Sequence, residues 1–414
     1  MAGSGSGNGG GGGATRRRLV APASELGVGG SHGAANGIKQ GHAPLTFESR
    51  PAKRSRSPPL LRRTWSLPFA LIIGALSLYA LNPTDTNVVY PFLRLSYKLD
   101  GGGGNPPRYG KGPLDLAYVA FFTVVLSFTR EFIMHEVLQP LARSVGIRAR
   151  AKQLRFMEQM YTAVYIAFIG PFGLYCMKQS PVWYFNTRGM YEDFPHKTHI
   201  AALKFYYLFQ AAFWLQQAIV MVLGIEKRRK DFRELVAHHI VTIALIGLSY
   251  RFHFTYMGIA VYLTHDISDF FLAVSKSLNY IDSPAQGGSF GLCILVWIYL
   301  RHYINLRIIW SLVYEFRTVG PYILDWETEQ YKCYISNIIT FVLLAALQAL
   351  NLYWLYCLLR SAYRFVFKGI AKDDRSDNEE PEIDVATHPL EAAELPPEAT
   401  KTEIAQNGDG VSVS

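Results

Sequence analysis

Residues 232–280 read FRELVAHHIVTIALIGLSYRFHFTYMGIAVYLTHDISDFFLAVSKSLNY, which is two apolar segments separated by a short junction. The first segment carries His238 and His239 near its start, and the second carries Asp266 and Asp269 near its end. An ionisable side chain costs about 2.5–3.5 kcal/mol at the centre of a membrane span, so it should face a protein interior or a wet cavity. The stretch predicts two membrane helices that hold a polar site.

Apolar runs of this kind recur along a chain of 414 residues that is 50% hydrophobic and 14% aromatic. A helix needs roughly 20 mostly apolar residues to cross a hydrocarbon core. The predicted spans are Ser66–Leu81, Leu116–Leu138, Gln159–Met177, Phe205–Ile225, Leu235–Tyr250, Phe254–Ser275, Phe290–Trp310 and Ile335–Leu359. The expected fold class is an all-α polytopic membrane protein with about eight transmembrane helices.

Basic residues set the expected orientation. Clusters lie before the first span, after the second, before the fifth and after the last, and they include Arg62, Arg63, Arg148, Arg150, Lys227–Lys230, Arg364 and Lys368. With eight spans all these clusters fall on one side, and positive loops stay in the cytosol. We therefore expect both termini to be cytosolic. The first thirteen residues have no apolar core, so no cleavable signal peptide is predicted.

Composition divides the chain into four parts. We predict a disordered basic tail over residues 1–60, a two-span membrane region over 61–150, a six-span catalytic domain over 151–367 and a disordered acidic tail over 368–414. The formal net charge of +9 favours anionic lipid headgroups over nucleic acid as a partner. The four cysteines have no CxxC spacing, which indicates neither a disulfide framework nor a zinc site.

Helix geometry brings the four ionisable residues to one depth. If a helix begins at Leu235 on the cytosolic side, His238 and His239 lie within about one turn of that face. The next helix returns from the far side, and Asp266 and Asp269 then lie ~18 and ~22 Å along it, in the cytosolic half of a ~30 Å core. Each residue alone has a structural explanation, as a helix bridge or a headgroup contact. Convergence of all four favours a functional site.

Two kinds of chemistry suit such a site. Histidine and aspartate are metal ligands, but the repeated HxxxH and HxxHH boxes of membrane di-iron enzymes are missing, so we predict no metal. A histidine beside carboxylates suits general-base or nucleophilic acyl transfer. The GxSxG elbow of a serine nucleophile is also missing. Acyl transfer through histidine is the favoured interpretation.

Three segments carry a family resemblance: FRELVAHHIVT, LTHDISDFFLAVSKSLNY and WIYLRHYINLRIIWSL. They resemble the Lag motif of the fungal ceramide synthases, within the wider TLC-domain family of TRAM-like, Lag-like and CLN8-like proteins. The resemblance covers about residues 151–367, and the upstream segment TREFIMHEVLQPLA is also similar to the fungal members. TRAM-like and CLN8-like proteins share the bundle but not the HH plus HDxSD pattern.

The resemblance implies acyl-CoA-dependent N-acylation of a sphingoid base in the endoplasmic reticulum membrane, giving dihydroceramide or phytoceramide. It implies no cofactor, since acyl-CoA is a substrate. Expected partners are long or very-long-chain acyl-CoA, the sphingoid base and membrane lipids, with a small single-span accessory subunit and a homodimer by analogy. Two alternatives stay open, a non-enzymatic translocation or cargo protein and a ceramide synthase paralogue that protects against a sphinganine-mimicking toxin.

The resemblance also suggests roles for particular residues. One of His238 and His239, by the resemblance His238, would attack the thioester or act as base, and its neighbour would hydrogen-bond or relay the proton. Asp266 and Asp269 would orient the imidazoles, stabilise an imidazolium or hold the ammonium group. Arg301, His302 and Asn305 belong to the third matching segment and would support the site. The basic run Lys227, Arg228, Arg229 and Lys230 has two compatible interpretations, a positive-inside anchor and a contact to the phosphates of coenzyme A. In animal members the last luminal loop tunes chain length, and it maps here to about residues 317–334.

The acidic C-terminal tail contains one candidate modification site. In KDDRSDNEEPE, Ser376 lies three residues before Glu379, the arrangement that an acidophilic kinase requires. A phosphate there would add about −1.5 to −2 charge close to the basic residues that follow the last span. We predict Ser376 to be a phosphorylation site, although short acidic serine motifs also arise by chance in tails of this composition.

Overall fold

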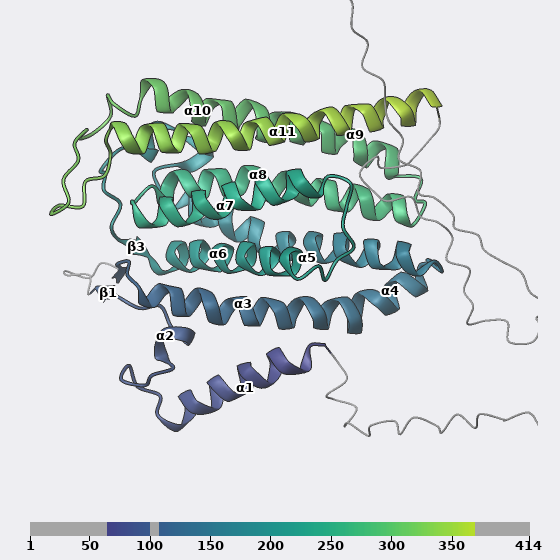
Figure 1. Cartoon of the computed structure of the whole chain (residues 1–414), viewed down its shortest axis with the longest axis horizontal. Coiled ribbons are helices and arrows are strands. Elements are labelled where there is room, and N and C mark those ends of the chain that lie inside the picture. The colour runs from purple at the N-terminus through teal and green to yellow at the C-terminus, as the bar shows by residue number, and fades with distance from the viewer. Residues whose placement is uncertain (1–63, 100–106, 369–414) are drawn as a thin grey trace, which may run out of the picture. The chain divides into compact units, whose positions relative to one another are not determined.

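The computed structural model describes residues 64–99 and 107–368, and it is almost entirely helical (Figure 1). Within these residues, seven helices are long and apolar enough to cross a membrane. The seven are Leu114–Ser144, Arg150–Lys178, Ala201–Val222, Phe232–Arg251, Thr255–Tyr280, Gln286–Tyr314 and Tyr334–Lys368. Two of them, Leu114–Ser144 and Gln286–Tyr314, contain a π-helical segment within the helix. The all-α polytopic fold predicted from the sequence is confirmed.

The first predicted span differs from the others. Helix α1 (Ser66–Leu81) has 16 residues, so it is ~24 Å long and shorter than a ~30 Å hydrocarbon core. It nevertheless lies along α3 (Leu114–Phe132). The Thr64 hydroxyl, just before α1, donates to Glu131 at the carboxyl-terminal end of α3, at 2.7 Å. The described residues therefore contain seven long spans and one short apolar helix rather than eight equal spans.

The remaining elements follow from the chain order. The first half contains α2 (Tyr90–Leu93), β1 (Lys98–Leu99), β2 (Arg108–Tyr109), α3 (Leu114–Phe132), π-helix η3 (Ile133–Leu138), α4 (Gln139–Ser144), α5 (Arg150–Lys178), 3-10 helices η4 (Trp183–Phe185) and η5 (Arg188–Met190), β3 (His199–Ile200) and α6 (Ala201–Val222). The second half contains α7 (Phe232–Arg251), α8 (Thr255–Tyr280), α9 (Gln286–Trp297), π-helix η6 (Ile298–Ile304), α10 (Asn305–Tyr314) and α11 (Tyr334–Lys368).

Helix α8 is the centre of the bundle. It packs against α5, α7, α9 and η6, and its many small residues, Ala260, Ser268 and Ala273 among them, allow neighbouring backbones to approach. Gly173 of α5 shows how close that approach is, since a Cβ there would lie 2.8 Å from a methyl group of Leu263. The HDxSD segment of α8 is consequently enclosed by helices on several sides.

The two ends of the bundle have different chemistry. We call the end that holds the three-stranded antiparallel sheet β1-β2-β3 the strand end, and the opposite end, where Lys227–Lys230 join α6 to α7, the basic end (Figure 1). The tails predicted to be disordered lie outside the described residues, apart from Lys368, which ends α11. Ser376 lies outside them as well.

A buried ion pair closes the strand end. Lys204 at the start of α6 and Asp115 at the start of α3 are 0% and 3% exposed, and their Nζ and Oδ1 atoms are 2.7 Å apart. Lys204 also donates to the carbonyl oxygens of Ser96 and Gly110, at 2.9 and 2.7 Å. The Tyr250 hydroxyl of α7 donates to Asp115 Oδ2 at 2.8 Å. This network fixes the strand-end positions of α3, α6 and α7, and α7 is the helix that carries the paired histidines.

Candidate active site

His238 and His239 lie near the amino-terminal end of α7, toward the basic end, and are 6% and 7% exposed. His239 is held by its own helix, since its Nδ1 donates to the Leu235 carbonyl oxygen at 2.9 Å. His238 is different. Its Nδ1 is buried without a hydrogen-bond partner among the described residues, and its Nε2 lies 3.5 Å from the Thr242 hydroxyl, the outer limit of a hydrogen bond. The imidazole of His238 is therefore available to a ligand.

Two tryptophans hold the His238 ring in place. Trp214 of α6 and Trp354 of α11 lie edge-to-face with it, at centroid distances of 5.5 and 5.2 Å. Trp214 makes the same kind of contact with His239 at 5.8 Å. His238 is therefore positioned by the packing of the Trp214 and Trp354 rings rather than by hydrogen bonds.

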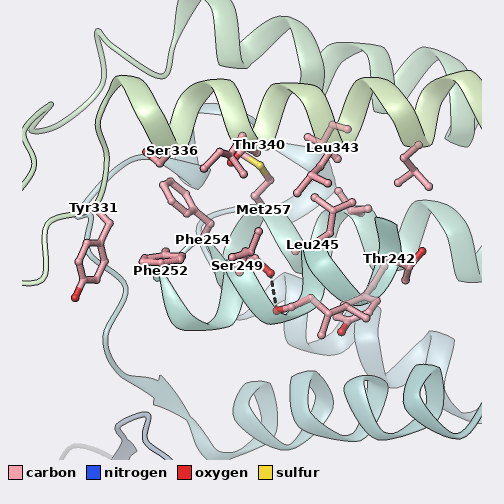
Figure 2. Close-up of a pocket in the computed structure, with 18 of the residues that line it drawn as sticks. Thr242, Leu245, Ser249, Phe252, Phe254, Met257, Tyr331, Ser336, Thr340 and Leu343 are labelled. Carbon is pink, nitrogen blue, oxygen red and sulfur yellow. Dashed lines mark hydrogen bonds between the residues drawn. The ribbon is translucent and has the colours of Figure 1, made fainter. Parts of the chain in front are cut away.

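An apolar cavity of about 210 Å³ begins at His238 and continues toward the strand end between α7, α8 and α11. Its lining in Figure 2 extends from Thr242 to Phe252 and Tyr331. His238 and Phe252 are fourteen residues apart on or just after α7, so these two lining residues are ~21 Å apart along the helix. The other lining side chains are mostly aliphatic or aromatic, such as Leu245, Met257, Ile339, Leu343, Leu347 and Trp326. A long hydrocarbon chain fits this lining, with its polar end at His238.

The far end of the cavity includes residues of the loop between α10 and α11. Leu324, Trp326 and Tyr331 from this loop contribute to the lining. They fall within residues 317–334, the segment to which the family resemblance maps the chain-length loop. The structure thus brings that segment to the end of the cavity opposite His238.

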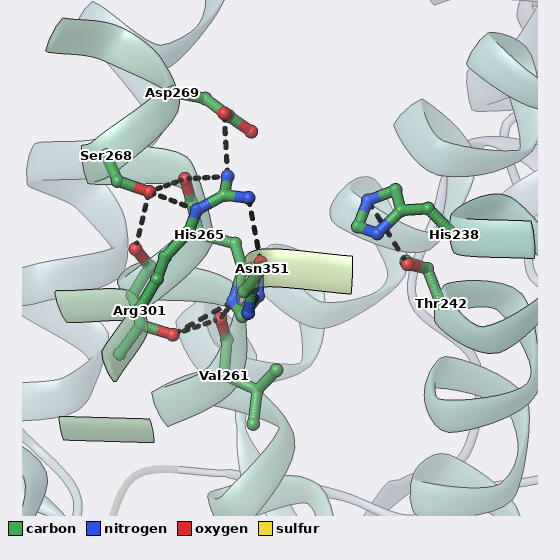
Figure 3. A network of polar contacts seen from close by, with 9 residues as sticks. His238, Thr242, Val261, His265, Ser268, Asp269, Arg301 and Asn351 are labelled. Carbon is green, nitrogen blue, oxygen red and sulfur yellow. Dashed lines mark hydrogen bonds and ion pairs between the residues drawn. The ribbon is translucent and has the colours of Figure 1, made fainter. Parts of the chain in front are cut away.

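Arg301 is the centre of a buried polar network beside the cavity (Figure 3). It pairs with Asp269 at 2.6 Å, donates from Nε to the Ser268 hydroxyl at 2.6 Å and donates to Asn351 Oδ1 at 3.2 Å. Its guanidinium also lies 3.9 Å from the ring centre of Trp297. A buried charge needs a full set of partners, and Arg301 finds its own on α8, α9 and α11.

The π-helical turn η6 carries two buried polar residues beside this network. Arg301 and His302 are neighbours within it and are 2% and 9% exposed. A π-helical turn holds one residue more than an α-helical turn, and such turns are frequent at functional sites. His302 Nδ1 accepts from Gln348 at 2.7 Å, and Gln348 accepts from Asn305 at 2.8 Å. All three predicted supporting residues lie in contact with α8 or α11.

A chain of directed hydrogen bonds fixes the protonation of His265. Arg301 can only donate, so Asn351 Oδ1 is the acceptor and its amide nitrogen is the donor to His265 Nε2, at 3.1 Å. The proton of a neutral His265 is then on Nδ1, which lies 2.9 Å from the Val261 carbonyl oxygen. His265 lines the same cavity as His238. Two histidines therefore line the cavity. The tautomer of His265 is fixed by its hydrogen-bond partners, and that of His238 is not.

The two predicted carboxylates have separate partners. Asp266 Oδ2 accepts a hydrogen bond from Gln210 of α6, whose amide oxygen accepts from the Tyr165 hydroxyl at 2.7 Å. Asp269 pairs with Arg301. Among the described residues, no hydrogen bond or ion pair joins either carboxylate to His238 or His239. Asp266 instead anchors the face of α6 that carries Trp214, four residues after Gln210.

The basic run is linked to the site through Asp231. Arg229 pairs with Asp231 at 3.2 Å, and Asp231, 2% exposed, accepts from Trp354 Nε1 at 3.1 Å. Arg228 lies over the Phe232 ring at 4.8 Å. Trp354 is the ring that packs against His238, so the loop containing Lys227–Lys230 is held directly above the site.

Several site residues were not predicted from the sequence, among them His265, Trp214, Trp354, Gln210 and Asn351. A signal for Asn351 does exist. Together with Gln348 it is one of the few amides in a long apolar helix, and polar residues inside a span usually mark a site. Within the described residues, no group of three or more His, Cys, Asp and Glu side chains is arranged to hold a metal.

Comparison with known proteins identifies relatives along most of the chain. Residues 155–360 match the TLC domain. A sphingosine N-acyltransferase-like protein of Gibberella moniliformis is 55% identical over 330 residues, which cover 78% of this chain and 85% of the relative. A ceramide synthase of Saccharomyces cerevisiae is 48% identical over 78% of each chain. A sphingosine N-acyltransferase of Schizosaccharomyces pombe is 46% identical over 78% of this chain and 83% of its own length.

Proposed function

The chain belongs to the TLC-domain family, and we propose that it is a ceramide synthase that passes an acyl group from coenzyme A through His238 to the amine of a sphingoid base. One observation carries the proposal. A buried histidine whose Nδ1 has no hydrogen-bond partner among the described residues lies where an apolar cavity begins. That combination suits a thioester whose hydrocarbon tail fills the cavity and whose carbonyl carbon meets the imidazole.

The proposed reaction has two acyl-transfer steps. A ring nitrogen of His238 attacks the thioester carbon, the carbon–sulfur bond breaks and coenzyme A leaves as the thiolate. The deprotonated amine then attacks the acyl-imidazole carbon, the carbon–nitrogen bond to His238 breaks and the amide forms. The net reaction releases coenzyme A and one proton. His239 would relay that proton through Nε2, since its ring lies 5.9 Å from the His238 ring between centroids and its Nδ1 is bonded to the Leu235 carbonyl oxygen.

Charge at the basic end supports the placement of coenzyme A. Its phosphates are anionic, and Lys227–Lys230 lie on the loop whose Asp231 is bonded to Trp354. We propose that Lys227, Arg228, Arg229 and Lys230 contact the phosphates while the thioester reaches down to His238. Arg228 and Arg229 already have partners in the free protein, so some of these contacts would be exchanged on binding.

We further propose an endoplasmic reticulum location with both termini cytosolic. Support comes from the basic residues at one end of the bundle and from α1, which lies along α3 and would provide a short eighth crossing. A homodimer and a small single-span accessory subunit remain proposals from the family resemblance. Either would cover part of the apolar outer surface of the bundle.

Microsomes from a host that lacks its own synthase test the proposed function. With sphinganine and a panel of acyl-CoAs, we expect ceramide from the wild-type protein and none from His238→Ala at equal protein abundance. Acyl-CoA supplied without the base should leave an acyl group on the peptide that contains His238, detected by mass spectrometry. Normal ceramide output from His238→Ala would contradict the assignment, and no output from wild type with any substrate would favour the non-enzymatic alternative.

A further inference from the structure

The two tryptophans beside His238 differ in the fate of their indole N–H groups. Trp354 Nε1 donates to Asp231 at 3.1 Å. Trp214 is 9% exposed, and its Nε1 is buried without a hydrogen-bond partner among the described residues. Most buried donors in proteins are paired, because an unpaired one forfeits its bonds to water, so an exception calls for an explanation.

Trp214 is held firmly in this arrangement. Its neighbour Phe213 stacks on Tyr165 at 3.7 Å, with 7° between the ring planes. Four residues earlier on the same face of α6, Gln210 is bonded to both Asp266 and Tyr165. Contacts to α5 and α8 therefore fix the part of α6 that presents Trp214, and an indole fixed in this way is preorganised.

Trp214 also lies where the reaction would create negative charge. It lines the cavity together with His238, and its ring is 5.5 Å from the His238 ring between centroids. When a nitrogen of His238 attacks a thioester, the carbonyl oxygen becomes an oxyanion, and a preorganised donor aimed at that oxygen lowers the barrier. An indole N–H that no protein group uses is suited to this purpose.

We propose that the Trp214 indole N–H donates a hydrogen bond to the acyl carbonyl oxygen and stabilises the oxyanion formed in acyl transfer. The inference rests on the proposed function and adds a catalytic residue to it. In the first step the oxyanion forms as the bond to His238 forms, and it collapses as the carbon–sulfur bond breaks. In the second step it forms again as the amine attacks, and it collapses as the bond to His238 breaks.

Another unpaired donor, away from the cavity, provides a control. The Tyr161 hydroxyl of α5 is buried without a hydrogen-bond partner among the described residues, and Tyr161 does not line the cavity. Tyr161→Phe therefore removes a buried unpaired donor without removing one beside the reacting carbon.

The experiment compares Trp214→Phe with Tyr161→Phe in the purified full-length protein. At saturating acyl-CoA, we expect Trp214→Phe to lower the rate of acyl transfer by about 10²–10³-fold, the usual effect of losing one oxyanion donor, with little change in KM. Tyr161→Phe should stay within a few-fold of the wild-type rate.

A second variant covers the case in which Trp214→Phe does not fold. Replacing Trp214 by benzothienylalanine keeps the shape of the ring and substitutes sulfur for N–H, so it should show the same loss of rate. A rate within threefold of wild type for either Trp214 variant would overturn the proposal, as would an equal loss of rate in Tyr161→Phe. Failure of the proposed function looks different, because the wild-type protein would then form no ceramide or His238→Ala would retain activity.

Discussion

Two ion pairs in this bundle have different surroundings. Lys204 and Asp115 meet at the strand end and are both buried, and the further bonds of the pair go to Ser96, Gly110 and Tyr250. Arg301, which is buried, meets Asp269, which is 30% exposed, and their network includes His265, which lines a cavity. Neither Lys204 nor Asp115 lines that cavity.

The difference shows which buried charges indicate function. Each pair contains a buried cation, and both networks connect three helices. The Arg301 network reaches His265, which lines the cavity together with His238 and Trp214, and the Nδ1 of His238 and the N–H of Trp214 have no hydrogen-bond partner among the described residues. The Lys204 network borders an unpaired group as well, the Ser96 hydroxyl, but Lys204, Asp115, Ser96, Gly110 and Tyr250 do not line that cavity. A buried polar network that borders an apolar cavity with unpaired groups is arranged for a ligand, whereas one away from any such cavity is structural.

The largest expected effect tests the cavity side of this comparison. His238→Gln should lower N-acylation by at least about 10³-fold, because the nucleophile is lost while a polar side chain of similar size remains. Protein abundance and thermal stability should be nearly unchanged, since His238 makes no hydrogen bond shorter than 3.5 Å among the described residues. The measurement is the initial rate with sphinganine and acyl-CoA. A rate close to wild type would remove His238 from the chemistry.

The matched variant at the strand end should show the reverse. Lys204→Met leaves Asp115 as a buried charge without its partner, which typically destabilises a protein by about 3–5 kcal/mol. We expect a lower yield and a lower unfolding temperature, but a normal rate per folded molecule. Thermal unfolding in detergent, combined with a rate corrected for folded protein, measures both. Full stability would show that Asp115 is stabilised by Tyr250 and the backbone alone.

A smaller effect is expected within the Arg301 network. Asn351→Asp keeps an acceptor for Arg301 but removes the amide donor to His265 Nε2, so His265 should adopt the other tautomer. Outer hydrogen bonds of functional histidines are typically worth about 10–100-fold, and we expect a loss of activity in that range. Stability should hold, because Arg301 gains a carboxylate. The NMR chemical shifts of the labelled His265 imidazole report its tautomer. An unchanged tautomer would show that the hydrogen bond from Asn351 does not determine it.

The smallest expected effect concerns how the stability of the protein falls at acidic pH, through a histidine at the strand end. Burial, aided by the positive charge of Lys111, lowers the pKa of His253 from its ordinary 6.5 to about 4, against the opposing effect of Glu329. Lys111 lies 3.3 Å from its Nδ1, Glu329 lies 3.6 Å from its Nε2, and the Tyr331 ring stacks on it. Lys197 and Arg251 add positive charge nearby.

Between pH 6.5 and 4 the unfolded chain holds a proton on this residue that the folded chain does not. The free energy of unfolding therefore falls as the pH drops through that window, by on the order of 1 kcal/mol at pH 4.5. His253→Gln should flatten the decline in unfolding temperature between pH 7 and 4.5. His196, whose pKa is also lowered to about 4, should leave part of the decline in place. An unchanged slope would mean that His253 is exposed before the protein unfolds.

The apolar helices and the pairing of α7 with α8 could be predicted from the sequence because both depend on runs of residues. Length and hydropathy determine where a helix crosses, and a rise of 1.5 Å per residue determines the depth of His238 and Asp266. The same reasoning predicts eight spans, and the described residues contain seven long ones and the shorter apolar helix α1, whose 16 residues extend ~24 Å.

The partners within the site could not be predicted in this way. Which face of α8 contacts which neighbouring helix depends on packing. In the folded chain Asp266 bonds to Gln210 and Asp269 pairs with Arg301, and neither carboxylate contacts the paired histidines by a hydrogen bond or ion pair among the described residues. Trp214 is one aromatic among many in α6, and only its unpaired N–H distinguishes it. Such a property exists only once the chain is folded.

The π-helical turn η6 has a consequence for comparing sequences across the family. A turn that holds one residue more than an α-helical turn behaves like a single-residue insertion inside an otherwise regular helix. Deleting one residue between Ile298 and Ile304 would let this segment close into an α-helix while α9 and α10 keep their register. Arg301 and His302 lie inside the segment, so the deletion would redirect their side chains and leave the rest of the bundle in place. A one-residue gap at this position in an alignment would therefore mark a relative that keeps the bundle and changes the site.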